Sequence, residues 1–149
     1  MIWAIVYLVG LFATQIAVQD MMISDAMALW IWFAILVVSS YSMQMSRNVK
    51  SATLKNAWML AMSLFVVLSV AMLLGVMAGS DAMVFGLFLL LNGAVIFAMG
   101  HDLKRGDWVA YGLYSSLFGL MFLSWFSATP YSAMAFILGV PLLLGTLKK

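Results

Sequence analysis

Hydrophobic positions in this chain form long, unbroken runs separated by short polar stretches. Six runs, at about residues 2–19, 26–45, 57–78, 82–100, 108–126 and 132–147, match the ~20 residues that a helix needs to cross a bilayer. None has the two-residue alternation of a strand, and backbone polar groups inside lipid must be satisfied internally. The pattern predicts an all-α membrane protein with six transmembrane helices in a single domain, residues 1–149.

A short polar phrase precedes each even-numbered run. SDAM occurs at Ser24–Met27 and Ser80–Met83, and a near copy, YSAM, at Tyr131–Met134. The phrases predict three hairpins, at about 1–45, 57–100 and 108–147. The phrases have two interpretations, namely helix caps and the trace of a repeated hairpin unit.

As helix caps, the two SDAM copies have clear roles. Ser24 and Ser80 are expected at N-caps, where a hydroxyl accepts from free backbone N–H groups. Asp25 and Asp81 would complement the positive ends of the helix dipoles.

The charged residues indicate the orientation of the helices. All basic residues fall in the connections after the second and fourth runs or at the C-terminus: Arg47, Lys50, Lys55, Lys104, Arg105, Lys148 and Lys149. In the other three connections the only charged residues are the aspartates at positions 20, 25 and 81. The positive-inside rule then places both termini in the cytoplasm, and the tryptophans that begin the odd-numbered runs (Trp3, Trp58 and Trp108) at the cytoplasmic interface.

Composition confines the chain to the membrane class and narrows its chemistry. Hydrophobic residues make up 66% and charged residues 8% of the chain, whereas soluble proteins carry about 25% charged residues. The chain contains no cysteine, which excludes disulfides and thiolate metal sites. The few basic residues are explained by membrane orientation, so no nucleic-acid partner is expected.

Catalytic side chains are scarce. The one histidine, His101, lies beside Asp102 at the end of the fourth run, where a solvated helix end is the simpler explanation than a catalytic dyad. One loop histidine cannot supply a histidine pair for haem, and the 14 methionines are scattered as packing residues would be. We therefore expect no enzyme activity, no cofactor and no metal.

The interior of the predicted helices is uncharged. No Asp, Glu, Lys or Arg lies mid-run, which argues against ion-coupled transport. Asn92, in LFLLLN (Leu87–Asn92), is the one amide near the centre of a run, and it either bonds to another helix or lines a path for a neutral solute.

Two groups of small residues predict close contacts between helices. Gly75 and Gly79 form a GxxxG pair, and the fifth run contains Gly112, Ser116 and Gly119. Pro141 predicts a bend in the sixth.

Several segments resemble the UreI/AmiS family of urea and short-chain amide channels. They are VYLVG (Val6–Gly10), LFLLLN, GDW (Gly106–Trp108), TPY (Thr129–Tyr131) and VP (Val140–Pro141). The resemblance implies six helices, passive flow, and a hexameric ring in which each protomer has its own pore. The chain departs from the family at QIAVQD, MSLFVVL and AFILGV, and Val109 replaces a second indole. The family orientation is also opposite to the charge pattern, which we follow here.

The resulting hypothesis is a passive channel for urea or a short-chain amide in a prokaryotic cell inner membrane, with Tyr7, Phe88, Asn92 and Trp108 along the path. Its partners would be the lipid bilayer and further copies of the chain. One alternative is a non-catalytic subunit of a larger membrane complex, which small size and short loops also fit. Another is an acetate-type weak-acid channel, although the Asn-Pro-Ala-Pro signature of that family is missing.

Overall fold

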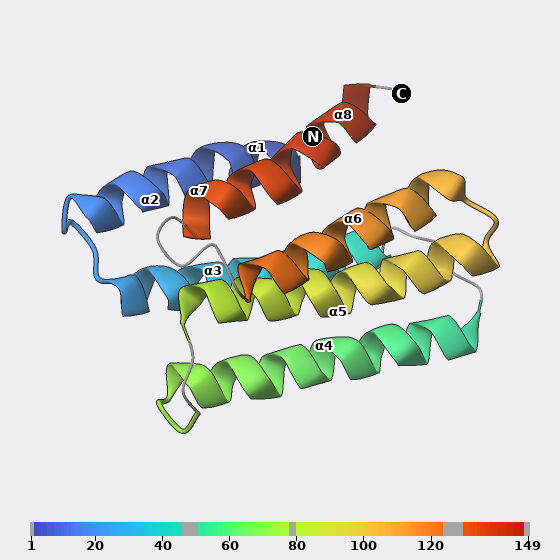
Figure 1. Ribbon diagram of the computed structural model, residues 1–149, viewed down its shortest axis with the longest axis horizontal. Coiled ribbons are helices and arrows are strands. Elements are labelled where there is room, and N and C mark those ends of the chain that lie inside the picture. The colour runs from blue at the N-terminus through green and yellow to red at the C-terminus, as the bar shows by residue number, and fades with distance from the viewer. Residues whose placement is uncertain (1, 46–50, 78–79, 124–129, 148–149) are drawn as a thin grey trace.

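The protein is a bundle of helices that run up and down (Figure 1). The computed structural model describes residues 2–45, 51–77, 80–123 and 130–147, and no strand occurs in these ranges. The helices are α1 (Ile2–Ile5), η1 (Val6–Gly10), α2 (Leu11–Gln19), α3 (Asp25–Met45), α4 (Ala52–Leu73), α5 (Asp81–Asp102), α6 (Gly106–Phe122), α7 (Pro130–Met134), η2 (Ala135–Gly139) and α8 (Val140–Leu147). The first three are continuous and form the first rod, residues 2–19; the last three form the last rod, residues 130–147.

Four described helical stretches are long and apolar enough to cross a membrane: Ile2–Gln19, Asp25–Ser42, Ala52–Leu73 and Ala82–Asp102. A shorter apolar stretch, Pro130–Leu144, lies in the last rod. The all-helical class and the apolar character expected of a membrane protein are therefore confirmed.

The helix α4 differs from its predicted run, 57–78, at both ends. It begins at Ala52 because the hydroxyl of Ser51 accepts a hydrogen bond from the Leu54 N–H (3.4 Å), so Lys55 lies in the helix and not in a loop. It ends at Leu73 because Gly75 adopts a φ of 71°, and the N–H of Val76 bonds back to the Ala71 carbonyl (2.9 Å). The predicted GxxxG contact is wrong, since Gly75 terminates the helix; Gly79 lies outside the described residues.

Charged side chains divide between the two ends of the bundle. Lys55, Lys104 and Arg105 are exposed at the end that carries the α5–α6 turn, which we call the basic end. Asp20 and Asp25 are exposed at the opposite end, the acidic end. Arg47, Lys50, Lys148 and Lys149 lie outside the described residues. Trp58 is only 4% exposed and packs edge-on against Tyr41 (centroids 4.9 Å apart), so a neighbouring helix covers its indole, and its place at the membrane interface stays a prediction.

Helix pairing departs from the predicted three hairpins. The last rod packs along the first rod, and α6 packs on α5, so the segment 108–147 is not a packed pair among the described residues (Figure 1). The reason is the distribution of small residues, which gives α5 and α6 matching glycine faces.

The α5–α6 contact is the most extensive between described helices, and glycines bring the two backbones close together there. A Cβ atom at Gly93 would lie 2.7 Å from the Ser116 nitrogen, and one at Gly112 would overlap the backbone nitrogen of Phe97. The hydroxyl of Ser115 donates to the Leu89 carbonyl across the same contact (3.0 Å). The remaining glycines of this interface are Gly86, Gly100 and Gly119. The predicted small face of the fifth run is thus an interface with α5.

The first and last rods each contain one π-helical turn, and the two turns lie side by side. In the last rod, η2 ends just before Pro141, which has no N–H and whose ring clashes with the carbonyl four residues earlier. In the first rod, the Thr14 hydroxyl donates to the Gly10 carbonyl at the end of η1 (2.8 Å). The wider π-helical turn η2 thus accommodates Pro141 in the last rod. In the first rod, the Thr14 hydroxyl satisfies a backbone carbonyl at the end of η1.

Candidate functional site

The centre of the bundle is α5, which contacts α3, α4, α6 and the last rod. Asn92 lies at the middle of this helix and is half-buried, and its carboxamide makes no side-chain hydrogen bond to a described residue. Its neighbours on the same face, one and two turns away, are all buried: Phe88, Leu89, Val95, Ile96 and Met99. Asn92 therefore offers uncommitted donors and an acceptor on a face of α5 whose other side chains are buried.

Phe88 lies one turn from Asn92 and is 1% exposed. Its ring meets Phe65 of α4 edge-on, with centroids 5.3 Å apart, and Phe65 in turn packs against Phe33 of α3 at 5.6 Å. Three helices thus meet through an aromatic row beside Asn92.

Tyr7 lies in η1 and is fully buried. Its hydroxyl is hydrogen-bonded to the hydroxyl of Ser39, and its ring stacks on Trp32 (6.2 Å). The Trp32 indole N–H donates to the Thr14 hydroxyl at 2.8 Å. These bonds connect the first rod to α3, so the Tyr7 hydroxyl already has a structural partner.

Trp108 is half-buried at the start of α6, near the basic end. The guanidinium of Arg105 lies 5.1 Å from the centroid of its ring, a cation–π distance, and donates two hydrogen bonds to Asp107 (2.7 and 3.0 Å). These hydrogen bonds from Arg105 lower the pKa of the Asp107 carboxyl, and the same bonds raise the pKa of Arg105. Trp108 is therefore held in a charged turn.

The predicted caps behave differently at the two copies of SDAM. The Ser24 hydroxyl accepts from the Met27 N–H (3.3 Å) before α3, and Asp25 lies in the first turn, as predicted. Ser80 occupies the N-cap of α5, but its hydroxyl makes no capping bond, which corrects that prediction. Its carbonyl instead accepts from Met83 (2.9 Å), and the side chain of Asp81 lies outside the described residues.

The YSAM copy is not a cap, because α7 already begins at Pro130 and Tyr131 is inside it. Proline suits the first helical position, where an N–H would have no partner. The buried ring of Tyr131 packs edge-on against Phe85 of α5 (5.3 Å). This copy therefore contributes to packing between α5 and the last rod.

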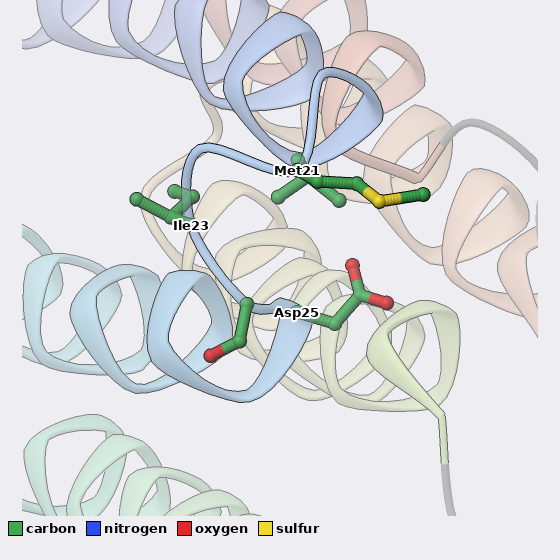
Figure 2. Close-up of a pocket in the computed structure, with 5 residues that line it drawn as sticks. Met21, Ile23 and Asp25 are labelled. Atoms are coloured by element: carbon green, nitrogen blue, oxygen red, sulfur yellow. The ribbon is translucent and has the colours of Figure 1, made fainter.

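An open cavity of about 420 Å³ lies at the acidic end, in the turn between α2 and α3. It is lined by Val18, Met21, Ile23, Ser24 and Asp25. Figure 2 shows the Asp25 carboxylate pointing toward Met21, with Ile23 projecting away from both. The cavity contains none of the four predicted path residues.

The four path residues thus lie in three settings. Phe88 and Asn92 are neighbours on α5, Tyr7 belongs to the hydrogen-bonded contact of the first rod with α3, and Trp108 lies in the basic turn. Tyr7 and Phe88 share one continuous buried cluster, against which Trp108 packs.

No protein-family model, curated protein or solved structure matches this chain. The residues described also hold no group of three or more His, Cys, Asp or Glu side chains placed to bind a metal ion.

The sequence did not distinguish one functional candidate, Ser69, from the other serines inside the apolar runs. Ser69 of α4 is fully buried, and its hydroxyl has no hydrogen-bond partner within the described ranges. Its position, one turn after Phe65 on the stripe of α4 that also carries Trp58 and Met62, was readable from sequence. The missing partner was not, because it depends on how α4 packs.

Proposed function

We propose that the protein is a passive membrane channel for a small neutral solute such as urea or a short-chain amide. The observation that carries the proposal is the uncommitted carboxamide of Asn92 on the central helix. A carboxamide both donates and accepts, so it can replace two of the hydrogen bonds that an amide solute loses on leaving water.

The charge distribution supports a neutral solute. In the sequence, no charged residue lies in the middle of an apolar run, so an ion would meet no compensation for its lost hydration. We further propose that the first rod, the helices α3, α4, α5 and α6, and the last rod all cross the membrane, with the basic end in the cytoplasm of a prokaryotic cell. No catalytic role is proposed.

Assembly into a ring of identical copies is part of the proposal. The resemblance of VYLVG, LFLLLN and GDW to the UreI/AmiS family suggests a hexamer with one path in each protomer. VYLVG coincides with η1, and π-helical turns often mark functional segments.

The test is solute flux into proteoliposomes containing the purified protein, followed by light scattering in urea and in acetamide gradients. Asn92→Leu should lower the flux about tenfold, since a loss of one net hydrogen bond at the barrier is worth about 1.4 kcal/mol. Asn92→Gln, which keeps the carboxamide, is the matched control and should retain most of the flux. Flux through the unaltered protein no faster than through empty liposomes would refute the channel.

A second candidate is an accessory subunit of a larger membrane complex, favoured by one face of α6. On a stripe turned about 100° from its glycine face, α6 exposes Leu113, Leu117 and Leu120, each by about half. This stripe could face lipid or a partner helix. A stable partner that co-purifies in mild detergent, together with no solute flux, would favour this candidate.

A weak-acid channel remains the third candidate. It would swell liposomes in acetate faster than in acetamide, and the difference would grow as the pH falls toward the pKa of the acid. The same preparation distinguishes it from an amide channel.

A further inference from the structure

An unpaired hydroxyl lies deep inside the bundle, on α4. Ser69 is 0% exposed, and its oxygen has no hydrogen-bond partner among the described residues. A serine within a helix commonly bonds back to the carbonyl four residues earlier, here that of Phe65, and Ser69 does not. A buried hydroxyl without a partner costs stability, so its presence calls for an explanation.

The position of Ser69 relates it to Asn92. Phe65 lies one turn before Ser69, and its ring contacts Phe88, which lies one turn before Asn92. Since α4 and α5 run in opposite directions, Ser69 and Asn92 lie on opposite sides of this ring contact along the bundle. At 1.5 Å per residue, each is displaced from it by roughly 6 Å.

We propose that Ser69 and Asn92 are two successive hydrogen-bonding positions of one route, separated by the Phe65–Phe88 ring pair. The inference rests on the proposed channel function and names the groups that a solute meets. Ser69, toward the acidic end, offers one hydroxyl, and Asn92 offers a carboxamide. Together they suit a neutral solute with a carbonyl and an N–H group, because it can bond on either side of the rings.

A first experiment measures acetamide flux in proteoliposomes. Ser69→Ala should lower the flux three- to tenfold, whereas Ser69→Thr, which keeps the hydroxyl, should retain at least half. Ser63→Ala changes an exposed serine of the same helix and should have no effect. The thermal unfolding temperature of Ser69→Ala should not fall, because the removed hydroxyl has no partner to lose.

Two results would overturn the inference while the channel stands: Asn92→Leu lowers the flux but Ser69→Ala does not, or Ser69→Ala lowers the flux and the unfolding temperature together. An unaltered protein without flux would overturn both the channel and this inference.

A second experiment does not depend on flux. The chain has no cysteine, so Ser69→Cys introduces a single thiol. The small neutral reagent methyl methanethiosulfonate should modify it in the reconstituted protein, and acetamide should slow the reaction. Ser115→Cys is the matched control, because Ser115 is also buried but pairs with the Leu89 carbonyl in the closed glycine contact. Equal resistance of the two thiols would refute access to Ser69.

Discussion

The α5–α6 contact and the α3–α4 contact join neighbouring helices by opposite means. Between α5 and α6, glycines allow backbone to touch backbone, and a Cβ atom at Gly100 would lie 2.5 Å from the Val109 nitrogen. Between α3 and α4, large side chains keep the backbones apart: Phe33 packs on Phe65, and the Ser40 hydroxyl donates to the Met62 sulfur (3.5 Å).

The difference separates a rigid part of the bundle from an adaptable one. A backbone contact has no rotamers to adjust, whereas Phe and Met side chains can shift to fill a changed space. The uncommitted polar groups of Ser69 and Asn92 lie on the buried faces of α4 and α5, outside the glycine contact. The proposed solute route would therefore run beside the aromatic row and not through the closed α5–α6 contact.

The largest expected effect is at Gly112. Gly112→Ala should reduce the free energy of unfolding by about 3 kcal/mol, because the added methyl overlaps the backbone of Phe97, and backbone cannot move aside as a side chain can. Chemical or thermal unfolding in detergent measures the loss. Gly106→Ala is the control, with no atom within 4 Å of the added Cβ, and should change stability by less than about 0.5 kcal/mol. Similar losses in the free energy of unfolding for the two variants would contradict a rigid α5–α6 contact.

A larger change of side chain in the α3–α4 contact should be better tolerated. Phe33→Leu should cost about 1 kcal/mol, because Phe65 and its neighbours can repack around a branched side chain. The same unfolding measurement applies. A loss greater than that of Gly112→Ala would show that the aromatic contact is the less adaptable of the two.

The turns that follow α4 and α5 allow a paired test of backbone strain. After α5, Lys104 adopts a φ of 52°, a left-handed conformation that Gly75 adopts after α4. Lys104→Gly should therefore stabilise the protein by about 1 kcal/mol, and Gly75→Ala should destabilise it by a similar amount. Opposite signs in thermal unfolding are expected, and a loss of stability for Lys104→Gly would contradict this account.

The smallest effect concerns pH at the basic turn. The hydrogen bonds from Arg105 lower the pKa of Asp107, so the ionised carboxyl favours the folded state above the ordinary aspartate value of about 3.9. That contribution should disappear as the pH falls through the lowered pKa. Both groups are exposed, so the change should be small. Carboxyl titration by NMR should show the Asp107 pKa rising in Arg105→Ala; an unchanged value would contradict the pairing.

Apolar runs were predictable because they depend on local chemistry, whereas the predicted hydroxyl cap forms at Ser24 and not at Ser80. The run at 82–100 differs from α5 by only a residue or two at each end, and Ser24 caps α3 as expected. The start of α4 was missed because its first turn, ATLKN, carries too few apolar residues to extend the run. The heptad spacing of Gly86, Gly93 and Gly100 was visible in the sequence and marks the α6 contact, but sequence alone did not say which helix would meet it.

The sequence by itself determined that this protein is helical, apolar and divided into basic and acidic ends, because hydrophobic length and charge position act without reference to partners. Only the tertiary structure decided that α6 belongs to α5 and not to the last rod, and that Tyr7 is paired while Asn92 and Ser69 are not. Whether a polar group is satisfied depends on atoms that packing brings within about 3 Å. Spacing along a helix cannot supply those atoms.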